Sequence, residues 1–120
     1  PAASVMIAGE GVETMLSLRV AWPSAPLVAA LTANHLAGLA FPSCLTRLYV
    51  ARDADHAGDA AFARLCERGD AAAIEVRGLE PQRDDFNTDL RARGSELLKR
   101  ALLAQIAPED AVLLGRPRGV

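Results

Sequence analysis

Acidic residues follow three apolar runs of the sequence, in positions where they could share a metal ion. Glu10 comes directly after a short apolar run that ends at Gly9, and Asp53 and Asp55 come directly after another. Asp85 lies in an acidic segment that follows a third run. Carboxylates brought together repel one another unless a cation neutralises them, and a cluster without His or Cys suits Mg²⁺ or Mn²⁺. The pattern therefore predicts a site for one of these ions.

The apolar runs and the stretches between them predict an α/β fold. Four runs have the length and the apolar character of buried strands: 5–8, 26–30, 48–51 and 73–76. Apolar residues at helical spacing follow the first three runs, over 12–20, from Thr32 or Asn34 to 41, and over 58–68. Strands that alternate with helices form right-handed crossovers and a parallel sheet. We therefore expect a central parallel sheet of about four strands with helices on both faces.

This fold would bring the acidic residues to one edge of the sheet. Ligands of open parallel sheets bind beyond the carboxyl ends of the strands, which is where Glu10, Asp53 and Asp55 lie in the predicted order. Asp53 and Asp55 would also point the same way in an extended chain. The alternative is that Asp-x-Asp is a common pattern and that an Asp before a helix is only an N-cap. His35 and His56 are expected to be loop or surface residues and not ligands.

The last part of the sequence predicts a helix that packs on the same domain. Residues 87–93 can form one or two helical turns, and Ser95 is predicted to cap a final helix. Its apolar stripe consists of Leu97, Leu98, Leu102, Leu103 and Ile106. We expect one domain over residues 1–94, with a C-terminal amphipathic helix and tail over 95–120 packed on it.

Composition limits the classes of function. The formal net charge of −2 argues against a stand-alone nucleic-acid binder. Cys44 and Cys66 lie too far apart for a zinc motif. The sequence shows no signal peptide and no apolar stretch long enough to span a bilayer, which predicts a soluble, cytoplasmic protein. The start at Pro1, without an initiator Met, predicts a piece of a larger protein.

Three segments, in this order, resemble the motifs of Toprim domains. Residues 6–18 resemble the Glu-Gly signature, and their Glu-Gly-x-Glu-Thr-x-Leu form resembles a branch found in phage- and plasmid-type bacterial primases. Residues 49–61 resemble the Asp-x-Asp motif of that branch with the Ala-Gly that follows it. Residues 85–90 resemble its closing Asp-Phe-Asn-Asp-x-Leu segment, with Thr88 where the branch more often has Asp. The resemblance runs from about Val5 to Gly94.

The resemblance implies a Toprim-like (Rossmann-like) fold and a catalytic role for Glu10, Asp53 and Asp55. It implies that Glu10 acts in acid–base or metal chemistry, and that Asp53 and Asp55 hold Mg²⁺ (or Mn²⁺). Asp85 is preferred to Asp89 as the further acidic ligand, because Thr88 stands where this branch more often has Asp. The implied activity is Mg²⁺-dependent nucleotidyl transfer for RNA primer synthesis in DNA replication. The implied partners are a DNA template, nucleotides and other domains of a larger bacterial chain.

Two alternatives share this fold. One is a metal-dependent nuclease or another strand-cleaving enzyme, and the other is a non-catalytic module that binds DNA or a protein. A topoisomerase needs a nucleophilic tyrosine, and the single tyrosine, Tyr49, lies within a predicted strand and is expected in the core. A phosphorelay receiver is rejected because the only lysine, Lys99, lies in the last predicted helix.

Overall fold

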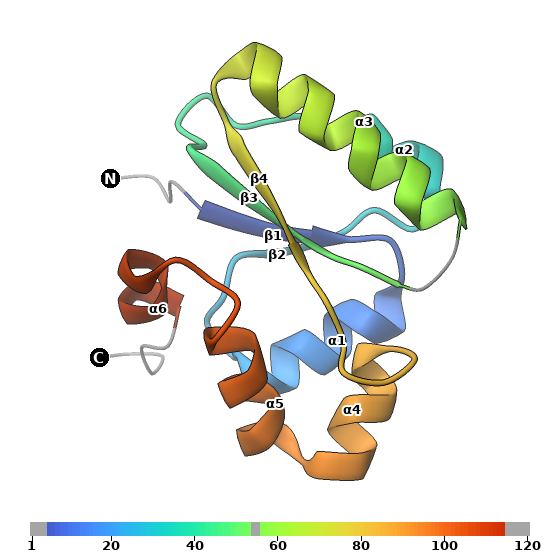
Figure 1. Cartoon of the computed structure of the whole chain (residues 1–120), viewed down its shortest axis with the longest axis vertical. Coiled ribbons are helices and arrows are strands. Elements are labelled where there is room, and N and C mark those ends of the chain that lie inside the picture. The colour runs from blue at the N-terminus through green and yellow to red at the C-terminus, as the bar shows by residue number, and fades with distance from the viewer. Residues whose placement is uncertain (1–4, 54–55, 115–120) are drawn as a thin grey trace.

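The computed structural model of the protein describes residues 5–53 and 56–114. A parallel four-stranded sheet with the order β2-β1-β3-β4 runs through its centre (Figure 1). The strands are β1 (Val5–Gly9), β2 (Leu27–Ala29), β3 (Arg47–Ala51) and β4 (Glu75–Leu79). The helices in this part of the chain are α1 (Val12–Ala21), α2 (Ala33–Ala37), α3 (His56–Ala72), α4 (Phe86–Arg93), α5 (Ser95–Leu103) and α6 (Pro108–Leu114).

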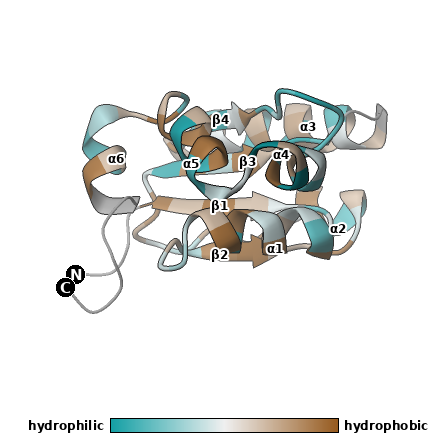
Figure 2. Ribbon diagram, turned by 90° about the horizontal axis from the view of Figure 1, so that it is seen from below, coloured by the Kyte–Doolittle hydropathy of each residue, from teal (hydrophilic) through white to brown (hydrophobic). Residues whose placement is uncertain are grey.

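Helices cover both faces of the sheet, as the sequence predicted. Helices α2 and α3 lie on one face, and α1, α4 and α5 lie on the other (Figures 1 and 2). The chain moves from β1 to β2 in one direction across the sheet and from β2 to β3 and β4 in the opposite direction. Because parallel crossovers are right-handed, this reversal puts α1 on the face opposite to α2 and α3. The predicted α/β fold is confirmed.

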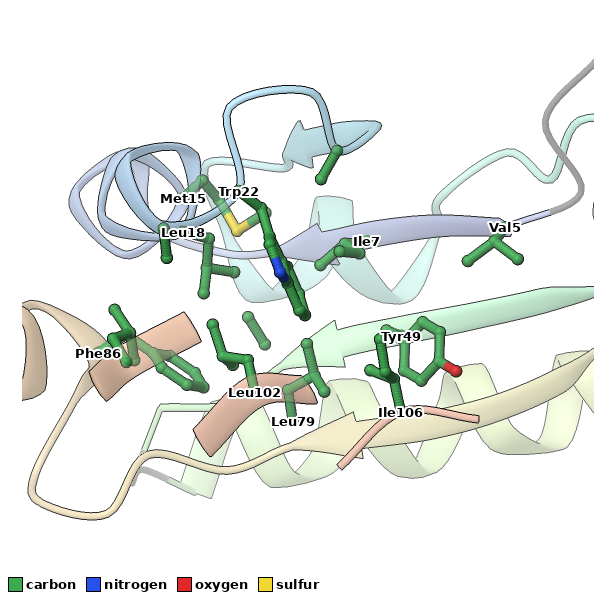
Figure 3. Packing of buried hydrophobic residues seen from close by; sticks show 14 residues of the cluster. Val5, Ile7, Met15, Leu18, Trp22, Tyr49, Leu79, Phe86, Leu102 and Ile106 are labelled. Carbon is green, nitrogen blue, oxygen red and sulfur yellow. The ribbon is translucent and has the colours of Figure 1, made fainter. Parts of the chain in front are cut away.

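Each face of the sheet has its own core. Successive strand residues point to opposite faces, so Ile7 and Tyr49 belong to one cluster while Ala8 and Val50 belong to the other. The first cluster joins the sheet to α1, α4 and α5, and it includes Leu18, Trp22, Leu79, Phe86, Leu98 and Leu102 (Figure 3). The second joins the sheet to α2 and α3. The near-continuous apolar runs of β1 and β3 follow from burial on both sides.

The end of α3 and the start of β4 differ from the prediction. The helix continues through Gly69 to Ala72, and β4 begins at Glu75, two residues later than expected. The residue with positive φ after the helix is Ala73, at 58°. Gly69 serves close packing instead, because an added Cβ would lie 2.6 Å from both the Ile74 carbonyl oxygen and Val76 Cγ2. In the sequence alone, a glycine that tertiary packing requires looks the same as a glycine that ends a helix, which explains the early helix end in the prediction.

The second and the last helices also differ from their predicted bounds. Thr32 caps α2 as one of the two expected candidates, accepting a hydrogen bond from the His35 amide at 3.0 Å, but the helix ends at Ala37 and not near residue 41. Gly94, with φ of 86°, and not Ser95, is the N-cap of α5. The single predicted C-terminal helix is two helices, α5 and α6, with Ile106 between them. No helix of the described residues is long and apolar enough to cross a bilayer.

Candidate metal and catalytic site

The two central strands bring Glu10 and Asp53 to the same edge of the sheet. β1 pairs with β3 so that their last residues, Gly9 and Ala51, are opposite each other. Glu10 follows the first of these directly, and Asp53 comes two residues after the second. The direction of the crossovers reverses between these strands, which makes this edge the topological switch point where open sheets bind their ligands.

The backbone of Glu10 is anchored by the neighbouring edge strand. After β2, the amide of Ala30 donates to the Gly9 carbonyl at 2.8 Å and the amide of Leu31 donates to the Glu10 carbonyl at 2.7 Å. Leu31 makes its contact with φ at 77°, a conformation that is unfavourable for a leucine. The strained residue therefore lies beside a predicted catalytic residue.

Gly9 lets α1 start close above the end of β1. A Cβ at this position would lie 2.5 Å from Met15 Sδ and 3.3 Å from Ala51 Cβ. The Met15 side chain fills this space and is 5% exposed. The glycine before Glu10 is thus a packing residue that brings the first turn of α1 near the strand ends.

Thr14, in that first turn, contacts the predicted metal ligand. Its hydroxyl Oγ1 donates to Asp53 Oδ1 at 3.0 Å, and the threonine is 6% exposed. One turn later, the Ser17 hydroxyl donates to the Glu13 carbonyl at 3.0 Å and lies 3.4 Å from Asn87 Oδ1 on α4. Helix α1 therefore connects the loop after β3 to the start of α4.

Arg52, the residue before Asp53, connects this loop to two other elements. Its guanidinium donates to Asp59 in the first turn of α3 at 2.5 Å and to Glu80 after β4 at 3.3 Å. The same group lies 4.4 Å from the centroid of the Phe62 ring. The positive charge of Arg52 is therefore paired with carboxylates of the domain itself, next to the predicted metal ligand Asp53.

The end of β4 is shaped to accept this arginine. An added Cβ at Gly78 would lie 2.9 Å from Arg52 Cδ, so the glycine leaves room for the side chain. The Arg52 amide also donates to the carbonyl of Leu79 at 3.0 Å, which continues the pairing of β3 with β4 beyond the last strand residue. Both the backbone amide and the side chain of Arg52 therefore hold the start of the loop that carries Asp53.

The third acidic segment divides into a capping residue and a buried residue. Asp85 is the N-cap of α4, and its Oδ1 accepts from the Thr88 amide at 2.7 Å, which holds the pKa of Asp85 below its usual value. Asp89 is 2% exposed, and its carboxylate accepts from the amides of Gln82 and Arg83 at 2.7 and 3.0 Å. Asp89 therefore maintains the turn before α4.

The donor set suits Mg²⁺ although the described residues do not complete a site alone. Asp55 lies outside the described residues. Within 5–53 and 56–114, no three side chains among His, Cys, Asp and Glu form a group that could hold an ion. Glu10 and Asp53 present only carboxylate oxygens, and Mg²⁺ needs one or two carboxylates because it retains waters and binds substrate phosphates. The metal roles of Glu10, Asp53, Asp55 and Asp85 stay predictions.

Tyr49 lies in the core, as predicted. Its side chain is fully buried beside Ile106 (Figure 3), its hydroxyl donates to Asp110 Oδ2 at 2.5 Å, and the Ala107 amide donates to that hydroxyl at 2.9 Å. Burial is the main reason that the pKa of Tyr49 is raised to about 12. A neutral, buried phenol at this position is structural.

Sequence reasoning did not identify Thr14 or Arg52 as parts of the site. Thr14 belongs to the Glu-Thr segment of the first motif, and its position there was a signal that could have been followed. Arg52 stands next to Asp53, but no local pattern indicates its role, because the carboxylates that bind it come from residues 59 and 80.

Comparison with known proteins identifies the family. A family model described as Toprim domain matches residues 5–96. The chain belongs to the Toprim domain family. Among solved structures, this Toprim domain is similar to the crystal structure of the Aquifex aeolicus primase (zinc-binding and RNA polymerase domains), with a TM-score of 0.58 and 23% sequence identity. The alignment covers 86% of this chain and 26% of that chain, so the domain spans about a quarter of the primase chain whose fold it shares. A comparison with curated proteins finds no match.

Proposed function

We propose that this Toprim domain is the Mg²⁺-dependent catalytic domain of a primase-like protein that transfers nucleotides to make RNA primers in DNA replication. The observation that carries the proposal is the placement of Glu10 and Asp53 at the switch point, beyond the ends of neighbouring central strands. Two carboxylates at this edge, in a family that includes bacterial-type primases, are suited to phosphoryl transfer. The Glu-Gly-x-Glu-Thr-x-Leu form of the first motif supports the primase assignment.

Glu10, Asp53 and Asp55 would hold the ion, with Asp85 as a further ligand. The bound ion would neutralise charge on phosphate oxygens. Glu10 would also act as the base that accepts the proton of the attacking 3′-hydroxyl, a role for which its half-buried position at the strand end leaves it accessible. Arg52 and Thr14 would hold the loop that carries Asp53 in place during this chemistry.

Template binding would come from the parent protein. The net charge of −2 is too low for this domain to hold a nucleic acid by itself, and Arg52 already pairs with Asp59 and Glu80. We therefore propose that neighbouring domains supply the basic surface, and that the DNA template and nucleotides bind across both. Activity is expected from the parent protein and not from the isolated domain.

Strand cleavage by a tyrosine of this chain is disfavoured. Tyr49 is the single tyrosine of the sequence, and its hydroxyl is buried and bonded to Asp110. It also lies in the middle of β3 and not in the loop after the strand, which carries Asp53. A covalent tyrosyl-phosphate intermediate on this domain would require the core to open.

A Mn²⁺ titration followed by NMR line broadening of backbone amides tests the metal site. We expect broadening around Glu10 and Asp53, and its loss in Asp53→Asn. Asp70→Asn is the matched control, because it removes an exposed carboxylate toward the other end of α3. Diffuse broadening that persists in Asp53→Asn would reject the site.

Primer synthesis by the parent protein tests the reaction. Glu10→Gln should abolish nucleotide transfer while the domain stays folded, since the glutamine keeps the size of the side chain but cannot accept the proton. Unchanged primer synthesis in this variant would remove Glu10 from catalysis. Strand cutting by the parent protein in place of primer synthesis would favour a nuclease.

A further inference from the structure

Helix α1 buries two hydroxyl side chains, Thr14 and Ser17, beside an apolar stripe of Met15, Leu18 and Ala21. Helices that cover a sheet normally place an apolar stripe against the core and polar residues in solvent. In α1, Thr14 and Ser17 are 6% and 3% exposed, whereas Leu16 and Val20 are 60% and 55% exposed. Burial of these two hydroxyl side chains, while two aliphatic side chains of the same helix stay in solvent, needs a specific reason, because a buried hydroxyl must find a hydrogen-bond partner to replace water.

The reason lies in the groups that these hydroxyls contact. Thr14 Oγ1 donates to Asp53 Oδ1 at 3.0 Å, and Ser17 Oγ lies 3.4 Å from Asn87 Oδ1. Thr14 and Ser17 are one helical turn apart, so they face the same side of α1. The part of the buried side of α1 that carries these two hydroxyls is thus matched to polar groups that follow β3 and begin α4.

We propose that Thr14 is a positioning residue that fixes the carboxylate of Asp53 for metal binding. The proposal rests on the metal role proposed above for Asp53. A carboxylate at the end of a strand can rotate about its side-chain torsions, and a hydrogen bond from a buried, rigid donor restricts that rotation. Thr14 is such a donor, since a β-branched residue in a helix has few rotamers. A hydrogen bond to a charged acceptor is also stronger than one between neutral groups.

A purely structural role for Thr14 makes a different prediction. If its hydroxyl only needs a partner for burial, substitution would change stability and leave Mn²⁺ affinity unaltered. Positioning residues around metal ligands typically change metal affinity by about 10–100-fold. Thr14→Val removes the hydroxyl and keeps the branched shape, whereas Thr14→Ser keeps the hydroxyl.

The test measures Mn²⁺ affinity by NMR line broadening in the wild-type chain, Thr14→Val and Thr14→Ser. We expect affinity to fall about 10-fold or more in Thr14→Val and to return to within a few-fold of wild type in Thr14→Ser. Thr46→Val is the matched control, since it makes the same change at an exposed threonine before the start of β3, at the other edge of the sheet. Unfolding is followed by fluorescence of the single tryptophan, Trp22.

A metal-free measurement separates the two proposals. The carboxyl ¹³C chemical shift of Asp53 should change in Thr14→Val and stay near the wild-type value in Thr14→Ser. Equal Mn²⁺ affinity of wild type and folded Thr14→Val would overturn the positioning role and leave the metal site intact. No specific Mn²⁺ binding by wild type would overturn the metal role and, with it, the positioning role. If Thr14→Val does not fold, Thr14→Ala carries the same comparison.

Discussion

Asp110 should contribute more to stability than its place on a short C-terminal helix suggests. It is 4% exposed, and its Oδ2 accepts from Arg47 Nη1 at 2.6 Å and from the Tyr49 hydroxyl at 2.5 Å. Both donors belong to β3, so the carboxylate attaches α6 to the central part of the sheet. We predict that Asp110→Ala detaches α6 and lowers the free energy of unfolding.

The magnitude follows from what the substitution leaves behind. The Tyr49 hydroxyl would keep only the Ala107 amide, to which it cannot donate, and a buried polar group without its partner costs about 1–3 kcal/mol. Breaking a buried ion pair by removing one member costs about 3–5 kcal/mol. Arg47 keeps Glu75 at 3.2 Å and its side chain is 18% exposed, which reduces that penalty. We therefore expect a loss of about 3 kcal/mol, a large part of the ~5–15 kcal/mol typical of a domain.

Urea unfolding followed by Trp22 fluorescence measures this loss, because the indole is 1% exposed in the core. Glu109→Ala is the control on the same helix: its side chain is 69% exposed and lies 4.0 Å from Arg47, so we expect a change of at most about 1 kcal/mol. Asp110→Asn should fall between the two, because the amide oxygen still accepts from the tyrosine. Equal stabilities of Asp110→Ala and Glu109→Ala would refute this reasoning.

Three further predictions concern a titration, a packing contact and the loop before Asp53. The pKa of Tyr49 is raised to about 12 from its ordinary value of 10.0, so the stability it contributes should be complete below pH 10 and lost as the pH rises through 12; phenolate absorbance forming near pH 10 in the folded domain would contradict this. Gly69→Ala should lower stability by about 1–3 kcal/mol, against at most about 1 kcal/mol for Gly11→Ala, where the Cβ meets open space and only the glycine N-cap of α1 is lost; equal urea midpoints would reject the packing role. Arg52→Lys keeps the positive charge but loses the guanidinium that donates to both Asp59 and Glu80. Amide hydrogen exchange at Asp53 should therefore accelerate, while stability changes by less than about 1 kcal/mol. Unchanged exchange would show that these two hydrogen bonds do not hold the loop.

The fold was predictable because β1 and β3 are buried on both sides. A parallel strand with helices on each face must be apolar throughout, and such a run is visible in a single sequence. β4 was displaced in the prediction because Arg77 and Gly78 interrupt its apolar character. Gly78 is there to leave room for Arg52, a contact between residues distant in sequence that no local pattern reveals.

Hydrophobic periodicity predicted only part of the buried face of α1. The predicted helical spacing includes five apolar residues, and two of them, Met15 and Leu18, are buried, whereas Val12, Leu16 and Val20 are exposed. Periodicity assumes that burial is decided by hydrophobicity, whereas Thr14 and Ser17 are buried by hydrogen bonds to other segments. Functional sites are where such local rules are expected to fail.

The candidate site was predictable to the extent that topology determines it. The carboxyl-end rule needs only the order of strands and loops, and it placed Glu10 and Asp53 correctly at one edge. The N-cap role that was considered for the Asp-x-Asp pair is seen at Asp85, whose Oδ1 caps α4, and its metal role stays a prediction. The burial of Asp89 and Asp110 was not visible, because the amides, the arginine and the tyrosine that satisfy them are supplied by the folded chain.

Stability and metal affinity should be separable properties of this domain. Asp110 contacts Arg47, the first residue of β3, and thus acts at the end of the sheet opposite to the site. Thr14 acts at the switch point, through one hydrogen bond to Asp53. Loss of the first contact should lower unfolding free energy while the remaining folded molecules still bind Mn²⁺ with unchanged affinity. Loss of the second should weaken Mn²⁺ binding in molecules of near-normal stability. Because Asp110 contacts Arg47 and Tyr49 within β3, whereas Thr14 contacts Asp53 beyond the end of that strand, the two sets of contacts share no partner, and their effects should add in the double variant.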